Sequence, residues 1–174
     1  MKELKFRTLY ADEIDVRVAQ ISDKGAQLLL YKDARCDMNI LDETVTPFKW
    51  QRVHSRDNAN CSVMIYNDET RDWIVKEDTG TESNTEAAKG LASDSFKRAC
   101  VNWGIGRELY TSPFIWVKAD GIQLKKNEKT GKVQTYDKFV VEKIAYDEKK
   151  NITGLAIKNV SMNKRVFVWQ KEKA

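Results

Sequence analysis

Two adjacent cations, Lys97 and Arg98, follow Phe96 directly inside a segment with helical periodicity. Neighbouring residues of a helix are about 100° apart, so the two side chains flank the apolar stripe rather than oppose it. Lys89, eight positions earlier, is displaced by only about 80°, so the three cations form a stripe about 12 Å long. Such a stripe can follow a phosphate backbone. The alternative is an ordinary salt-bridged helix surface, because Asp94 precedes the pair by three and four residues.

Residues with the usual catalytic chemistry are few. His54 is the one histidine, in a polar stretch with no nucleophile motif beside it, which disfavours a Ser-His-Asp or Cys-His arrangement. The three cysteines, Cys36, Cys61 and Cys100, are widely spaced and odd in number, which fits buried single thiols better than disulfides or a metal knuckle. We therefore predict no catalytic residue and no bound metal.

The sequence also lacks clear motifs for nucleotide phosphate binding and for metal-dependent catalysis. The chain has no GxxxxGK[ST] motif, and Gly104-Ile105-Gly106 follows a helix, where a dinucleotide fingerprint would follow a strand. A metal-dependent nuclease needs carboxylates around a cation with a lysine nearby, and Asp137 with Glu148-Lys149-Lys150 offers a loose approximation. A solvent-exposed turn explains Glu148-Lys149-Lys150 better than a metal site does. We expect no cofactor.

Charge is unevenly distributed along the 174 residues. Residues 1–84 hold 12 Lys+Arg and 16 Asp+Glu, whereas residues 85–174 hold 18 and 10, giving the whole chain a net charge of +4. The basic second half favours a polyanionic partner, although a lysine-rich solvated surface gives the same count. The length suits a single domain over residues 1–174. The sequence has no apolar run that could span a membrane and no signal-peptide pattern, so we expect an intracellular protein.

The predicted fold class is α+β, with an antiparallel sheet packed on one long helix and a strand-rich C-terminal extension. The long helix covers about 85–103, has a capping-box spacing at Ser83 and Glu86, and ends at Gly104. A β-hairpin is predicted over 61–66 and 73–75. The other expected elements are a helix beginning at Thr8 with Tyr10, Ile14 and Val18 on one face, a strand over 26–31, a short helix over 35–43, and strands over 135–145, 152–157 and 165–169.

Three segments in order carry a resemblance to a known family. They are Glu77-Asp78-Thr79-Gly80, Ser93-Asp94-Ser95-Phe96-Lys97-Arg98-Ala99 and Trp103-Gly104-Ile105-Gly106. Together they resemble the Rad52 family of single-strand annealing proteins, and the phage Sak-type members most. The resemblance covers roughly residues 8–117, the annealing core, and leaves 118–174 as the extension. It implies a β-β-β-α core that assembles side by side into rings, with single-stranded DNA in a basic outer groove.

The resemblance also implies which residues bind DNA. Lys97 and Arg98 match the family's Lys-Arg pair, and Arg35 matches an Arg after the first strand. Arg71 and Lys89 fall near further basic contact positions. Val101 stands where eukaryotic members carry another Arg, and their recombinase-binding C-terminal region has no counterpart.

The expected function is therefore ATP-independent annealing of complementary strands in homologous recombination and DNA repair, by a phage or prophage protein in the cytoplasm of a bacterial host. Its expected partners are single-stranded DNA and further copies of the chain in a ring, with a single-strand binding protein or a phage exonuclease as additional candidates. The alternatives are a metal-dependent nuclease or other DNA-processing enzyme, and a single-strand protector that does not anneal.

Overall fold

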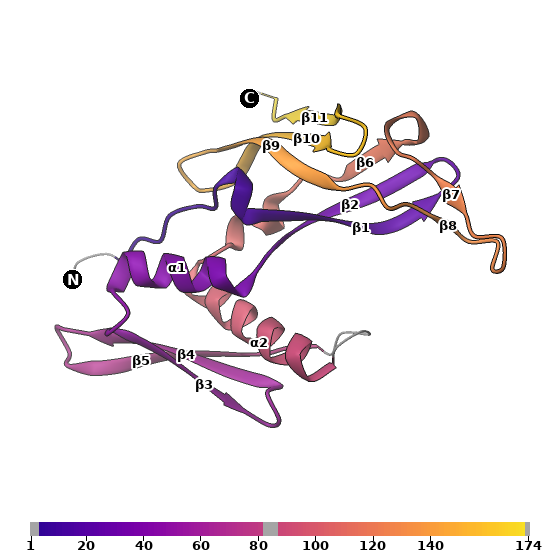
Figure 1. The fold of residues 1–174 in the computed structure, drawn as a ribbon. Coiled ribbons are helices and arrows are strands. Elements are labelled where there is room, and N and C mark those ends of the chain that lie inside the picture. Colours follow the sequence, from indigo (N-terminus) through magenta and orange to yellow (C-terminus); the bar gives the residue numbers. More distant parts are fainter. Residues whose placement is uncertain (1–3, 82–86, 173–174) are drawn as a thin grey trace. The chain divides into compact units, whose positions relative to one another are not determined.

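A computed structural model describes residues 4–81 and 87–172, and the chain divides into two compact units (Figure 1). Unit 1 comprises Met1–Thr8 and Asp33–Arg107, and unit 2 comprises Leu9–Lys32 and Glu108–Ala174. The units do not follow the expected border near residue 117, because the first β-hairpin of the chain belongs with the C-terminal strands. A single domain over residues 1–174 stays a prediction.

Unit 1 is a three-stranded antiparallel sheet with two α-helices over one face (Figure 1). Its strands, in spatial order, are β3 (Trp50–Ser55), β4 (Asn60–Asn67) and β5 (Asp72–Thr79), and its helices are α1 (Ala34–Val45) and α2 (Ala87–Trp103). The predicted hairpin, short helix and long helix are thereby confirmed, and so is the α+β class. Among the described residues, however, α1 lies over the sheet together with α2, so an antiparallel sheet packed on one long helix alone is not confirmed.

The core of unit 1 follows from alternation in β4 and helical spacing in α2. Cys61, Val63 and Ile65 point to one face of the sheet and are buried. The buried residues of α2 recur at intervals of one, three and four, which gives a continuous stripe: Leu91, Ser95, Phe96, Ala99 and Cys100. The helix ends at Gly104, whose φ of +99° L-residues rarely adopt. The predicted capping residues Ser83 and Glu86 lie outside the described residues.

Unit 2 is a six-stranded sheet in the order β11-β10-β9-β1-β2-β6, antiparallel at every pairing. Its strands are β1 (Ile14–Ser22), β2 (Gly25–Lys32), β6 (Ile115–Lys118), β9 (Phe139–Tyr146), β10 (Ile152–Asn159) and β11 (Lys164–Gln170). Short 3₁₀ turns lie at Ala11–Glu13, Arg107–Thr111 and Ala119–Gly121. The predicted strand over 26–31 and the three C-terminal strands are confirmed, although β9 begins at Phe139 rather than near 135.

The predicted N-terminal helix is wrong. Residues 11–13 form a single 3₁₀ turn, and the chain then enters β1. Tyr10, Ile14 and Val18 fit a helical spacing of four, but Ile14, Val16 and Val18 also fit the period of two, and β-branched residues favour a strand. Pairing with β2 along its length decides between the two patterns.

Within the part of the chain that the structure describes, no helix is long and apolar enough to cross a membrane.

Candidate nucleic-acid interface

Phe96 fixes the turn of α2 that carries the Lys-Arg pair. Its ring is fully buried and stacks on the Trp50 ring, with centroids 6.1 Å apart. The Arg52 guanidinium lies over the same ring, 4.6 Å from the centroid. The Trp50 indole N–H donates to Asp42 Oδ1 at 2.6 Å, which ties β3 to α1. Lys97, the next residue along the helix, therefore starts from a well-anchored turn of α2.

Arg52 is a cation that the sequence prediction missed. It lies on β3, an edge strand of this sheet, and its register partner is the buried Val63, so it faces the helix side. Arg52 is exposed, and no carboxylate among the described residues pairs with it or with Lys97. Arg52 on β3 thus contacts the Phe96 ring and Lys97 follows Phe96 on α2, and neither has an acidic partner among the described residues. The alternation Trp50-Arg52-His54 could have revealed this face.

Arg98 lies on the side of α2 that faces β5. Its Nε lies 3.7 Å from Asp78 Oδ1, and Asn102, four residues later on the same flank, donates to Asp78 Oδ2 at 3.2 Å. The Arg98 side chain remains 45% exposed, and a pair this exposed contributes at most about 1 kcal/mol. The expected partner, Asp94, instead accepts from the N–H and hydroxyl of Thr81, at 2.9 and 3.3 Å. The salt bridge with Asp94 is therefore not formed, and Asp78 takes its place.

The Glu-Asp-x-Gly motif at the end of β5 holds the sheet against α2. Glu77 Oε2 accepts from the Ser62 hydroxyl at 2.6 Å on the face away from the helix. Gly80 lies so close to the helix that a Cβ atom there would be 2.6 Å from the Ser95 amide nitrogen. Together with the Asp78 contacts, this approach sets where the basic turn of α2 stands over the sheet. The motif acts by positioning.

Arg35 lies in the first turn of α1. Its Nε and Nη2 donate to Asp33 Oδ2 at 2.9 and 2.6 Å, and the Asp33 carboxylate caps the helix by accepting from the Arg35 N–H. The adjoining guanidinium lowers the pKa of Asp33. The Arg35 side chain is 81% exposed, so a phosphate can approach it, in competition with Asp33.

The two remaining predicted contacts are Arg71 and Lys89. Arg71 is exposed in the turn between β4 and β5, with a φ of +55°, beyond the last register pair of the hairpin. No described residue forms an ion pair with it. Lys89 lies in the first turn of α2, and its side chain is outside the described part. The structure thus associates Lys97, Arg98 and Arg52 with one stretch of helix and sheet, and leaves Arg71 at the tip of the hairpin.

The contacts of His54 link strand β3 to helix α2. Its Nδ1 lies 3.4 Å from the Ser95 hydroxyl, which itself donates to the Asn58 carbonyl at 2.9 Å. Burial, and then the charge of Arg52, lower the pKa of His54, which favours the neutral imidazole. The contact joins β3 to α2, and the Ser95 hydroxyl is fully buried, where no substrate can reach it.

The carboxylates considered for a nuclease lie at opposite ends of β9. Asp137 precedes the strand, and its Oδ2 accepts from the Gln123 N–H and from Asn159 Nδ2, each at 2.7 Å. Glu148 follows the strand in an exposed turn. Eight extended residues separate them by about 25 Å. No group of three or more His, Cys, Asp or Glu residues able to hold a metal occurs within residues 4–81 and 87–172.

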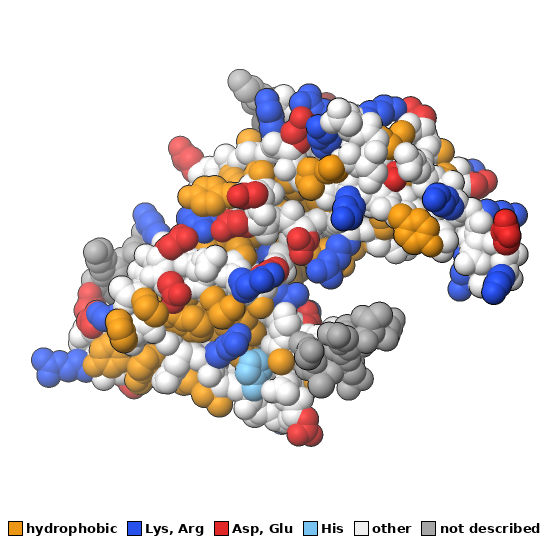
Figure 2. Space-filling view, viewed as in Figure 1, with side chains coloured by type: hydrophobic (Ala, Val, Ile, Leu, Met, Phe, Trp, Pro, Cys, Tyr) orange, Lys and Arg blue, Asp and Glu red, His pale blue; other side chains and the backbone are white. Residues whose placement is uncertain are grey.

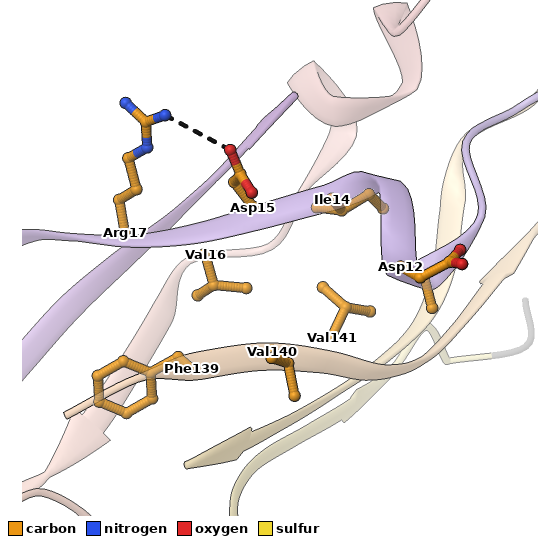
Figure 3. A pocket seen from close by; sticks show the side chains of 9 residues that line it. Asp12, Ile14, Asp15, Val16, Arg17, Phe139, Val140 and Val141 are labelled. Carbon is orange, nitrogen blue, oxygen red and sulfur yellow. Dashed lines mark hydrogen bonds and ion pairs between the residues drawn. The ribbon is translucent and has the colours of Figure 1, made fainter. Parts of the chain in front are cut away.

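Unit 2 contains an open cavity of about 750 Å³ between β1 and β9 (Figure 3). The two strands meet at one register pair, Asp15 with Val140, and Val16 and Val141 lie in the space between the strands. Arg17 Nη2 lies 3.4 Å from Asp15 Oδ2. The lining is mostly apolar, and its charged residues are Asp12 and the Asp15–Arg17 pair.

Comparison with known proteins gives one match. Residues 31–131 match the sequence model described as Rad52/22 family double-strand break repair protein. The matched range contains every element of unit 1 from α1 to α2, and with them the three motif segments and the basic turn of α2. No curated protein and no solved structure matches the chain.

Proposed function

The chain belongs to the Rad52/22 family of double-strand break repair proteins, and on that premise we propose that it binds single-stranded DNA and anneals complementary strands without ATP. The family places the chain in DNA repair and recombination. The observation that supports the finer proposal is the basic turn of α2: Lys97 and Arg98 follow Phe96, which anchors the turn, and the Arg52 guanidinium lies over the Phe96 ring.

The proposed mechanism is physical rather than chemical. Cations along α2 and β3 neutralise the phosphates of one strand and hold the strand extended, while its bases stay accessible. A complementary strand then pairs with those bases, and base pairing supplies the free energy. No nucleotide hydrolysis enters this scheme, in keeping with a sequence that has no Walker A motif.

We expect the individual cations to contribute unequally to the affinity for DNA. Lys97 and Arg52 lack an acidic partner among the described residues, so a phosphate meets them at full charge. To bind a phosphate, Arg98 must give up its contact with Asp78, and Arg35 must give up its contact with Asp33. Lys89 and Arg71 complete the proposed set as outer contacts. We expect the unpaired cations to contribute more to affinity than the paired ones.

Assembly into a ring is part of the proposal. One unit offers a few phosphate contacts, too few for tight binding at physiological salt, and repeated copies along one strand multiply them. β3 and β5 are the two edges of the unit 1 sheet, and neighbouring copies would cover such edges. A phage or prophage origin, a bacterial cytoplasm, and work beside a single-strand binding protein or phage exonuclease belong to the same proposal.

Charge removal at α2 tests the assignment. We expect Lys97→Ala and Arg98→Ala each to weaken binding of a labelled single strand and to reduce the slope of log affinity against log salt by about 0.7 per lost phosphate contact. Arg52→Ala is expected to match Lys97→Ala. Lys149→Ala, in an exposed turn of unit 2, is the charge-matched control. Variants at Lys97 and Arg98 that keep wild-type affinity and salt slope would show that the interface is elsewhere.

The same samples separate the proposal from its alternatives. With Mg²⁺ or Mn²⁺ present, end-labelled DNA keeps its length if the protein anneals and is shortened if it is a nuclease. Complementary strands pair faster with an annealing protein and more slowly with a single-strand protector.

A further inference from the structure

The net positive charge of the chain lies in unit 2, whereas the α2 interface belongs to unit 1. The segments of unit 1 hold 13 Lys+Arg and 14 Asp+Glu, a net charge of −1, whereas unit 2 holds 17 and 12, a net charge of +5. Several cations of unit 2 are neutralised in ion pairs: Arg17 with Asp15, Lys164 with Asp120, and Arg165 with Glu142. The uncompensated charge therefore lies elsewhere in this unit.

A short β-hairpin carries much of it. Strand β7 (Lys125–Lys126) pairs with β8 (Val133–Gln134), and the tip extends beyond the end of the six-stranded sheet (Figure 1). Asn127 holds the tip, because its N–H donates to the Lys132 carbonyl at 2.9 Å and its Oδ1 accepts from the N–H groups of residues 129 and 130, each at 3.0 Å. The tip is therefore formed without using any lysine side chain.

The lysines of this hairpin are exposed and uncompensated. Residues 125–132 contain four lysines, Lys125, Lys126, Lys129 and Lys132, and one acidic residue, Glu128. All five side chains are exposed, and none of the lysines forms an ion pair with any residue that the structure describes. Figure 2 shows these blue side chains grouped around the hairpin at the right of the view. The local charge is +3 on a projecting ribbon.

An exposed aromatic ring lies beside these lysines. Tyr136 is 71% exposed, and Lys125 Nζ lies 5.5 Å from its ring centroid. Its hydroxyl accepts from Gln134 Nε2 at 2.9 Å. Lys125 and Gln134 are register partners, so their side chains lie on one face of the ribbon. A cation, an amide and an exposed aromatic ring therefore lie together on this hairpin.

We propose that the β7–β8 hairpin is a second contact for single-stranded nucleic acid, with its lysines on phosphates and the Tyr136 ring stacked on a base. An exposed ring next to unpaired cations is the combination that binds single strands, because every base offers a face for stacking. A duplex hides those faces, and an acidic peptide offers none, so the ring favours a single strand over both. This contact involves residues of unit 2 only and adds to the proposed function.

The full chain with a single-stranded oligonucleotide containing 2-aminopurine tests the proposal. We expect Lys125→Ala/Lys132→Ala to lower the salt slope by about 1.4, the value for two phosphates, while Lys118→Ala/Lys149→Ala, which removes two exposed lysines elsewhere in unit 2, leaves the slope unchanged. Tyr136→Ala should weaken binding about 5- to 100-fold and reduce quenching of 2-aminopurine. Tyr136→Phe, which keeps the ring, should bind like wild type.

Each alternative outcome has a defined meaning. Equal effects from the hairpin pair and the control pair would reveal diffuse electrostatics and overturn the proposal, as would normal binding by Tyr136→Ala. Loss of duplex binding alone would assign the hairpin to a duplex instead. Hairpin variants that bind DNA normally, with weak binding by Lys97→Ala, would reject the hairpin contact and leave the α2 interface standing. The reverse pattern would keep the hairpin and reject the α2 interface, and a wild-type chain that binds no single strand would reject both.

Discussion

Gly80→Ala tests how the basic turn of α2 is positioned. The added Cβ would lie 2.6 Å from the Ser95 amide nitrogen and 2.9 Å from the Leu91 carbonyl oxygen, both in the backbone of α2. A helix backbone cannot swing aside as a flexible side chain does, so helix and strand must separate. Overpacking of this kind costs about 1–3 kcal/mol. With a urea m-value of about 2 kcal/mol/M, a loss of 2 kcal/mol lowers the unfolding midpoint by about 1 M.

A matched substitution provides the control. At Gly154 in β10, an added Cβ would meet the Ala145 Cβ at 3.5 Å and the Trp169 carbonyl oxygen at 4.0 Å, which are ordinary contacts. Glycine weakens a strand by about 0.5–1 kcal/mol relative to alanine, so Gly154→Ala should be as stable as wild type or slightly more stable. Urea unfolding followed by tryptophan fluorescence and circular dichroism measures both. A Gly80→Ala protein as stable as wild type would refute the close approach of β5 and α2.

Three further predictions concern the interface, the assembly and the buried thiols. Arg35→Ala should slow annealing as Lys97→Ala does, whereas Lys149→Ala should not, and equal loss from Arg35→Ala and Lys149→Ala in an annealing assay would point to general charge effects. Sedimentation should show a particle of several copies, and a strict monomer that anneals at full rate would contradict the ring. Burial raises the pKa of the Cys61 thiol to about 11, so that thiol stays protonated at pH 8 and should react with Ellman's reagent only on unfolding. Because this pKa is raised above its ordinary value of 9.0, the thiol's contribution to stability should be lost as the pH rises from about 9 to 11.

The sequence was most informative where a single period dominates. The buried stripe of α2 and the alternation of β4 each admit one interpretation, and both elements were predicted correctly. The Tyr10, Ile14 and Val18 spacing admits two, and long-range pairing with β2, which no local pattern reveals, selects the strand.

Strand β3 was missed for a different reason. Its inward face carries Trp50, Arg52 and His54 rather than three aliphatic residues, so it looks polar in the sequence. Its packing comes from α2, through the contact of Phe96 with Trp50 and Arg52. The same contact makes Arg52 part of the candidate interface. The exchange of Asp94 for Asp78 as the partner of Arg98 likewise depends on how β5 packs against the helix.

The central claim is that this chain pairs complementary single strands by itself. The most direct measurement follows two complementary labelled oligonucleotides in buffer without ATP, with wild-type protein and with Lys97→Ala/Arg98→Ala. We predict faster pairing with wild-type protein than without it, little acceleration by the double variant, and strands of unchanged length. Wild-type protein that binds the strands yet leaves their pairing rate unchanged or slower at every concentration would contradict the claim.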